Sequence, residues 1–304
     1  MHRRQTPRPL VLTLLVAATA ARAQDIEPRA YSNAPIGVNF LGVGYAFTQG
    51  SLPTNPSLPL TASHLTTSSA VLGYGHVFDL WGQSAKINVV APYSWLSGNA
   101  VFAGQPVQRS VNGLIDTSVK ASVNFYGAPA MDLQEFRNYK QDLILGASLT
   151  VTVPSGQYDS SRLVNLGTNR WSIRPELGAS KAFDPLTVEL SVGPTFFTNN
   201  TNFLNGHTRS QDPIVSGQAH AIYDFGSGLW GSLDGQYWTG GSTTVDGTGN
   251  QDLQRNLRLG ATFALPLSRN YSLKFFASTG VSARTNNNYD LFGILVQYRW
   301  GAGL

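Results

Sequence analysis

The stretch that decides the fold is Tyr289-Asp-Leu-Phe-Gly-Ile-Leu-Val-Gln-Tyr-Arg-Trp300. Every second side chain in it is apolar or aromatic: Phe292, Ile294, Val296, Tyr298 and Trp300. The intervening face carries Gly293, Gln297 and Arg299, with Leu295 as its apolar exception. A period of two predicts a strand, because successive side chains point to opposite faces. An apolar face that ends in aromatic rings is typical of the last strand of an outer-membrane β-barrel, and it also fits a strand of a soluble β-sandwich.

The beginning of the chain favours the barrel. Residues 1–23 have the order of a secretory signal peptide, with a basic start, a short apolar run over 10–20 and the cleavage pattern Ala21-Arg22-Ala23. We therefore expect cleavage between Ala23 and Gln24. The apolar run has about eleven residues, fewer than the ~20 that a helix needs to cross a bilayer.

Charge and composition narrow the class of protein. The chain has 21 Lys and Arg and 17 Asp and Glu, and the excess of four equals the Arg residues of the signal, Arg3, Arg4, Arg8 and Arg22. The mature chain is then formally neutral, so the charge gives no reason to expect nucleic-acid binding. The absence of Cys from the sequence excludes disulfides and thiolate chemistry. Charged residues make up only 12%, below the ~25% of soluble proteins, which suits a membrane barrel.

Segments of strand-like alternation recur along the mature chain. Each has roughly ten to fourteen residues, enough for a membrane strand of ~9–11 residues. They predict an all-β fold, a closed antiparallel transmembrane barrel of about twelve strands. The segments lie near residues 36–49, 66–79, 84–97, 111–126, 140–153, 169–182, 186–198, 213–226, 229–240, 254–265, 271–283 and 289–300.

The connections between these segments alternate in length. Short ones, such as 183–185 and 226–228, contrast with long polar ones, such as 154–168 and 241–253. Short periplasmic turns and longer extracellular loops are the asymmetry expected of an outer-membrane barrel. We divide the chain into a signal peptide (1–23), a short periplasmic N-terminal segment (24–35) and the barrel (36–304).

The alternation assigns the charged strand residues to one face, the lumen, since a charge facing lipid at mid-membrane costs ~2–4 kcal/mol. The candidate lumen-lining residues are Lys86, Asp116, Lys120, Asp142, Arg170, Arg174, Glu176, Glu189, Asp224, Asp234, Arg258, Lys274 and Arg299. Arg170, Arg174 and Glu176 would form either a charged constriction or an ion-pair lattice with Asp142 and Glu189. Inward-phased aromatic residues would form an apolar track, fill the interior or mark the membrane boundaries; they are Tyr126, Phe197, Trp230, Trp238 and Phe276.

Several motifs resemble a known bacterial family. Pro154-Ser-Gly-Gln-Tyr158 is followed by Asn165-Leu-Gly-Thr-Asn-Arg-Trp-Ser-Ile-Arg-Pro-Glu-Leu-Gly-Ala-Ser180, and the chain closes with Gln297-Tyr-Arg-Trp300. In this order they are similar to the family named for the meta-pathway of phenol degradation, whose members are labelled transporters. The resemblance spans roughly residues 36–300. It implies an outer-membrane channel linked to uptake of aromatic or other hydrophobic compounds, and it supplies no catalytic residues.

The function expected from these observations is passive diffusion of a small hydrophobic or aromatic solute, without a cofactor or metal site. The expected partners are outer-membrane lipid, the barrel assembly machinery acting through the C-terminal strand, and the solute. One alternative is a closed barrel that works through its outer loops as an adhesin or structural protein. A second alternative is a lipid hydrolase, for which His76 beside Ser68 or Ser69 would be the candidate pair.

Overall fold

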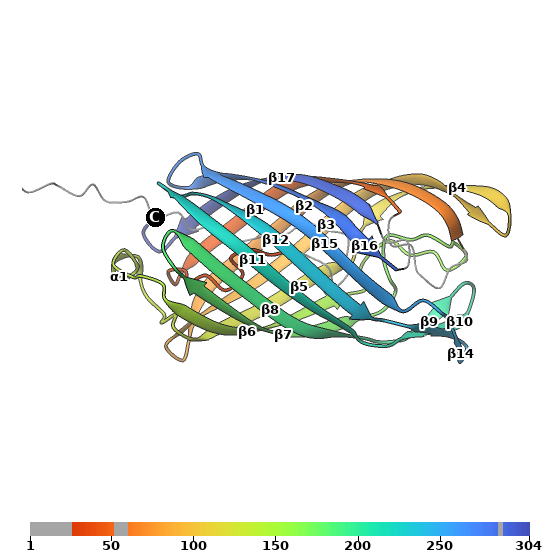
Figure 1. Cartoon of the computed structure of the whole chain (residues 1–304), viewed down its shortest axis with the longest axis horizontal. Helices are drawn as coiled ribbons and strands as arrows, with labels where there is room; N and C mark the ends of the chain where they lie inside the picture. Colours follow the sequence, from red (N-terminus) through yellow and green to blue (C-terminus); the bar gives the residue numbers. More distant parts are fainter. Residues whose placement is uncertain (1–25, 52–59, 285–287) are drawn as a thin grey trace, which may run out of the picture.

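The computed structural model is a closed antiparallel barrel of twelve strands, which confirms the predicted fold class (Figure 1). The structure describes residues 26–51, 60–284 and 288–304, so the predicted signal peptide and its cleavage point lie outside it. The wall consists of β1 (Val38–Gly50), β2 (Leu60–Leu80), β3 (Gln83–Phe102), β5 (Thr117–Tyr126), β6 (Leu143–Val153), β7 (Ser172–Ala182), β8 (Leu186–Phe197), β11 (Ile214–Gly226), β12 (Leu229–Gly240), β15 (Gln254–Pro266), β16 (Tyr271–Ala283) and β17 (Tyr289–Gly301).

The seam that closes the barrel joins the first and last strands. β1 pairs with β17 along its whole length, from Val38 opposite Gly301 to Gly50 opposite Tyr289. Closure of this kind leaves the wall without a free sheet edge. The predicted faces of β17 are confirmed, since Phe292 is 61% exposed on the outside while Gln297 is buried.

Leu295 is the apolar residue on the inward face of β17. It is fully buried and lies opposite Gly44 of β1. A Cβ atom built on Gly44 would come within 2.8 Å of the Leu295 side chain. Leu295 therefore fills space left by a glycine, which explains why it interrupts an otherwise polar face.

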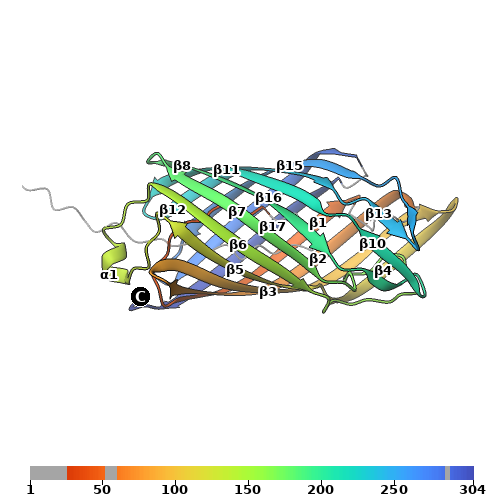
Figure 2. The same ribbon diagram turned by 90° about the horizontal axis from the view of Figure 1, so that it is seen from below.

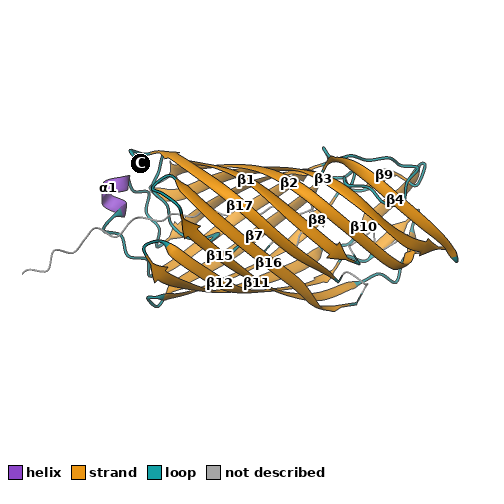
Figure 3. Ribbon diagram, turned by 90° about the horizontal axis from the view of Figure 1, so that it is seen from above, coloured by secondary structure: helices purple, strands orange, loops and turns teal. Residues whose placement is uncertain are grey.

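The two ends of the barrel differ, and we call them the short-turn end and the loop end. The short-turn end carries tight connections such as 183–185 and 227–228, together with the C-terminus and the one-turn helix α1 (Leu133–Phe136) (Figures 2 and 3). The helix begins at Asp132, whose carboxylate accepts hydrogen bonds from the backbone N–H groups of Gln134 and Glu135. This capping box satisfies N–H groups that a helix start otherwise leaves without partners.

The loop end extends well beyond the barrel wall (Figure 1). β2 and β3 have 21 and 20 residues, and twenty residues at ~3.3 Å each span about 66 Å. That length exceeds the ~30 Å of a membrane core even for a tilted strand. Parts of the predicted loops are thus strands: β3 pairs beyond the wall with β4 (Gln105–Leu114), and a small sheet contains β9 (Asn200–Phe203), β10 (His207–Gln211), β13 (Thr243–Val245) and β14 (Thr248–Gly249).

Candidate functional site: the barrel lumen and the segment inside it

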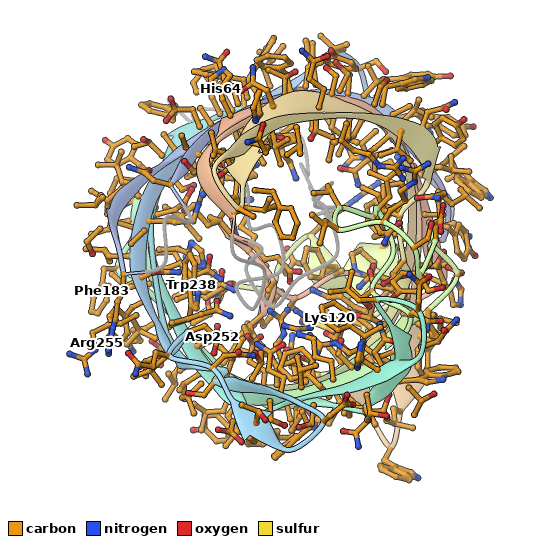
Figure 4. All side chains as sticks on the ribbon, turned by 90° about the vertical axis from the view of Figure 1, so that its right-hand side faces the viewer. His64, Lys120, Phe183, Trp238, Asp252 and Arg255 are labelled. Atoms are coloured by element: carbon orange, nitrogen blue, oxygen red, sulfur yellow. The ribbon has the colours of Figure 1, made fainter. Side chains whose placement is uncertain are left out.

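The inner wall of the barrel carries most of the charged residues that the alternation assigned to it. Seen along the barrel axis, Lys120 and Trp238 point inward, while Phe183 and Arg255 point outward (Figure 4). The Lys120 side chain is only 12% exposed. The other buried members of the predicted set are Lys86, Asp116, Arg170, Arg174, Glu176, Glu189, Asp234, Arg258, Lys274 and Arg299.

Two residues of the predicted set lie elsewhere. Asp142 precedes the first residue of β6, and its side chain is 80% exposed and forms an ion pair with Lys181. Asp142 belongs to the set of alternate positions that faces the lumen along β6, but it lies beyond the end of the wall. Asp224 lies near the end of β11 at the rim, with its side chain 51% exposed and 4.0 Å from Arg29. For both residues the alternation continues past the point at which the lumen ends.

Residues 26–36 lie inside the barrel, and they overlap the segment 24–35 that we assigned to the periplasm from the sequence. This lumen segment leads directly into β1 at the short-turn end, where Ala34 packs with Val38, Phe40 and Val77. The backbone N–H of Ile36 donates to Met131 O (2.9 Å). Eleven residues are too few to form a separate plug domain, but they are enough to bury polar side chains against a wall that offers matching partners.

Glu27 supplies the strongest ionic contacts of the lumen segment. Its carboxylate lies 2.5 Å from Lys120 Nζ on β5 and 3.9 Å from an Arg174 guanidinium nitrogen on β7. The Glu27 backbone N–H donates to the side-chain oxygen of Gln218 on β11 (3.0 Å). One residue therefore bridges strands that lie on different parts of the wall.

Tyr31 fills a recess between two strands. Gly146 of β6 and Gly178 of β7 lie directly opposite each other, and a Cβ atom on either would come within 2.5 and 2.0 Å of the Tyr31 ring. The phenolic hydroxyl donates to Glu176 Oε1 (2.9 Å), and Asn124 Nδ2 donates to the Tyr31 backbone oxygen (3.0 Å). The two glycines make room for the ring, since it could not lie there over a side chain.

Lys86 and Trp230 hold the backbone turn of the lumen segment. Lys86 Nζ donates to the backbone oxygens of Ala30 (3.2 Å) and Ser32 (2.6 Å). Arg29 has a φ of +69°, a left-handed conformation uncommon for residues other than glycine, and its guanidinium lies 4.6 Å from the Trp230 ring centroid. These contacts fix the shape of the segment as well as its position.

A row of titratable side chains continues around the wall from the lumen segment. Glu189 on β8 lies opposite His220 on β11, which in turn lies opposite Asp234 on β12. His220 Nδ1 is 2.8 Å from Asp234 Oδ1, and the second Asp234 oxygen accepts hydrogen bonds from Ser232 (3.1 Å) and Thr262 (3.2 Å). The row is buried, and the contacts of Asp234 join β11, β12 and β15 inside the barrel.

Asp116 fixes the loop between β6 and β7, nearer the loop end. Its carboxylate accepts hydrogen bonds from the backbone N–H groups of Gly156 (2.9 Å) and Thr168 (2.8 Å) and from the Thr168 hydroxyl (2.6 Å). Gly156 and Gly167 pack so closely that a Cβ on either would lie within 2.8 Å of backbone atoms of the other or of Asp116. The motif residues of the loop between β6 and β7 therefore clamp this loop onto the inner wall.

The inward-phased aromatic residues divide between the interior and the outer surface. Trp230 and Trp238 are fully buried, Phe276 packs over Gly293, and the Arg170 guanidinium lies 4.4 Å from the Phe197 ring centroid. Tyr126 is 57% exposed, because a bulge between Val123 and Tyr126 shifts the register against β6. The two tryptophans thus fill the interior and do not belong to an outward-facing belt.

The residues considered for hydrolase chemistry do not form a nucleophile–base pair. His76 Nδ1 lies 2.9 Å from Asn39 Oδ1, whereas Ser68 accepts from Tyr45 (2.8 Å) and Ser69 pairs with Ser94. Seven residues along one strand separate Ser69 from His76, which is about 23 Å. Among the described residues there is also no cluster of three or more His, Cys, Asp or Glu side chains arranged to hold a metal ion. No helix in the described ranges has the length and apolar composition to cross a bilayer.

Sequence reasoning missed the lumen segment as part of the site. A signal was present, because Glu27, Arg29 and Tyr31 place two charges and an aromatic ring directly before the first strand. In a chain that directs most strand charges to one interior, such residues are candidates for the same interior. The pairing of Gly146 with Gly178 could not be read without the strand register.

The chain is similar to known outer-membrane barrels. The structure of the COG4313 outer membrane channel from Pseudomonas putida F1 matches with a TM-score of 0.72 at 19% identity, covering 91% of this chain and 99% of that one. The transport unit of the Escherichia coli autotransporter AIDA-I matches with a TM-score of 0.47 at 8% identity (86% and 90% covered), and the TodX monoaromatic hydrocarbon channel with 0.48 at 12% (90% and 92% covered). No curated protein is significantly similar in sequence. The family model described as "Putative MetA-pathway of phenol degradation" matches residues 45–300, and the chain therefore belongs to that family.

Proposed function

We propose that this protein is an outer-membrane channel through which a small hydrophobic or aromatic solute diffuses passively. The observation that carries the proposal is a closed ring of strands, apolar outside and polar inside, whose lumen holds the short segment 26–36 by side-chain contacts. Twelve strands give an interior between that of eight-stranded barrels, filled by side chains, and that of sixteen-stranded porins, which enclose a water channel. Membership of a family named for phenol degradation supports an aromatic solute.

The proposed membrane orientation follows from the asymmetry of the two ends. We place the short-turn end in the periplasm and the loop end outside the cell, the arrangement that outer-membrane barrels share. The exposed apolar side chains of the wall would contact lipid, and β17 would present the final strand to the barrel assembly machinery. Residues 1–23 would direct export and be removed after Ala23.

The lumen segment and the Asp116 clamp make this channel closed at rest. Hydrogen bonds to charged groups contribute ~1.5–3 kcal/mol each, and the segment makes several of them. Passage of a solute then requires that the segment or the clamped loop leave the wall. In this respect the proposed channel differs from a general porin, whose lumen is permanently filled with water.

The proposal is tested by conductance and uptake of the mature protein and of a variant lacking residues 26–35. We expect small, infrequent currents in planar bilayers for the intact protein and a larger, steady conductance for the variant. Liposomes that contain the intact protein should take up phenol or benzoate faster than empty liposomes. A heat-modifiable shift in gel mobility checks that both proteins form the barrel. Absence of current and of uptake in both proteins would overturn the channel proposal.

The projecting loop end favours one alternative, an adhesin or structural protein. The long strands β2 and β3, the strand β4 and the four-stranded sheet form a folded surface beyond the wall. If the intact protein and the segment-deleted variant are both silent in bilayers while cells that display the protein bind a surface or a partner, this alternative replaces the channel.

A further inference from the structure

The lumen segment places a carboxylate and an aromatic ring in one site on the inner wall. We call it the wall site, made of Lys120, Gly146, Arg174, Glu176 and Gly178. Glu27 and Tyr31 of the segment occupy it together. Both occupants come from a stretch that is not part of the wall, so another molecule with the same groups can take their place.

The net positive charge of the wall site favours binding of an anion. Two of its three charged residues are cations, Lys120 and Arg174, and Glu176 lies 3.7 Å from Lys120 Nζ. With the segment in place all three side chains are at most 12% exposed, and when Glu27 leaves, the site keeps one excess positive charge. Since an unbalanced buried charge is costly, departure of Glu27 is favoured when another carboxylate replaces it.

The recess beside the cations fits a flat ring. Gly146 and Gly178 face each other across β6 and β7 and leave bare backbone, against which the Tyr31 ring lies at van der Waals distance. At one edge of the ring the Glu176 carboxylate accepts the phenolic hydrogen bond (2.9 Å). The recess therefore recognises a planar aromatic ring and has an acceptor for a hydroxyl group on it.

The two subsites are close enough to serve one small molecule. The Tyr31 hydroxyl, Glu176, Lys120 and Glu27 form a continuous chain of contacts of 2.9, 3.7 and 2.5 Å. The phenolic oxygen and the Glu27 carboxylate oxygen thus lie within about 9 Å of each other, a separation on the scale of a few hydrogen-bond lengths. The strand register places Glu176 between the glycine recess and the row of Lys120 and Arg174, so a molecule that fills both subsites carries its carboxylate on a short chain that leaves the ring at the Glu176 edge.

We propose that the wall site binds an aromatic ring that carries a carboxylate on a short chain, and that Glu27 and Tyr31 are its tethered substitutes. The inference rests on the proposed channel function and narrows its solute class. A solute that binds the wall site displaces the lumen segment, so recognition and opening are one event. An uncharged aromatic alcohol lacks the group that replaces Glu27 and leaves the segment in place.

The test compares 3-phenylpropanoate with 3-phenylpropan-1-ol as probes of the mature protein in detergent, by calorimetric titration. Substitutions on the two sides of the ionic contact have opposite expected effects. Lys120→Gln removes a wall cation and should weaken 3-phenylpropanoate binding about ten-fold or more, the loss expected for one charge-assisted hydrogen bond. Glu27→Gln removes the competitor and should strengthen binding by a similar factor. Arg258→Gln, which removes a buried lumen cation outside the wall site, is the matched control and should change affinity less than three-fold.

Each outcome decides between the two proposals. Equal binding of the acid and the alcohol, or weaker binding in both Glu27→Gln and Lys120→Gln, overturns the wall site while leaving the channel proposal intact. If Lys120→Gln fails to form the barrel, Arg174→Gln replaces it with the same expected direction. Liposome uptake of the two probes tests the channel proposal separately. If only the alcohol is taken up, the proposed solute class is refuted. If neither probe is taken up, the channel proposal is refuted.

Discussion

Gly178→Ala is expected to open the barrel without harming its wall. The added methyl group would lie 2.0 Å from Tyr31 Cε2 and 2.3 Å from Tyr31 Cζ. Carbon atoms pack at ~3.5–4.0 Å, so the ring must move by about 1.5 Å or more. The new methyl group would be attached to β7, whose backbone is held by hydrogen bonds to β6 and β8. The ring of Tyr31 is therefore the part that gives way.

The size of the effect follows from what Tyr31 loses when it moves. Its hydrogen bond to the Glu176 carboxylate contributes ~1.5–3 kcal/mol, since the acceptor is charged. That loss alone changes the ratio of seated to released segment by roughly 10- to 150-fold. Loss of ring burial adds to it, because Tyr31 is 1% exposed in its recess. Ala suits a strand interior at least as well as Gly, so the wall is not weakened by the change in backbone propensity.

The assay is single-channel recording of the mature protein and two variants. Gly178→Ala should raise the open fraction at least ten-fold, whereas Gly217→Ala should leave it unchanged, since the nearest atom to its new methyl group is Ser191 O at 3.5 Å. A heat-modifiable gel shift shows that both barrels have formed. The reasoning fails if Gly178→Ala has the conductance of the unsubstituted protein, or if Gly217→Ala opens equally.

Three further predictions concern the loop end and the outer wall. Asp116→Asn should release the loop that Asp116 clamps, at a cost of ~1.5–3 kcal/mol, and make that loop susceptible to protease in folded barrels. The hydrogen bond from His207 lowers the pKa of Asp246 in the folded protein. This contact therefore stabilises the small outer sheet at pH values above ~3.9, the pKa of Asp in the unfolded chain. The stabilisation is lost as the pH falls through the lower pKa of Asp246 in the folded protein. Hydrogen exchange of the sheet from pH 7 to pH 3 should show this loss, and Asp246→Asn should abolish the pH dependence. Val296→Arg, on the outer face of β17, should cost ~2–4 kcal/mol of barrel stability in lipid vesicles. The control substitution Val107→Arg, in the projecting strand β4, should be tolerated. Equal effects of the two substitutions would refute the inference that the wall faces lipid.

The lumen segment and the clamped loop give the two ends of the barrel different tasks. The segment is held through backbone groups and through side-chain groups, and among the latter a solute can replace the Glu27 carboxylate and the Tyr31 hydroxyl. The loop is held through backbone N–H groups donated to Asp116, which a solute does not mimic as readily. We therefore place solute recognition at the segment and expect the loop to limit what reaches it.

The alternation along β17, taken with the signal-like start of the chain and its low content of charged residues, predicted the fold before any tertiary contact was known. Phe292 and Gln297 belong on opposite faces of any strand that contains both, and only a closed ring in a membrane gives lipid to one and a polar interior to the other. Charges such as Lys86 and Asp234 could be phased for the same reason. The pattern failed at Asp142 and Asp224, because a period of two carries no information about where the wall ends.

The location of residues 26–36 was decided only by the tertiary structure. Glu27 and Tyr31 are ordinary polar residues in a segment without periodicity, and their partners lie from 93 to 191 positions away in sequence. The recess for Tyr31 exists because strand register sets Gly146 opposite Gly178, and the register depends on the whole ring of strands. Local alternation thus fixes which way a side chain points, while the identity of its neighbour across the lumen follows from closure of the barrel.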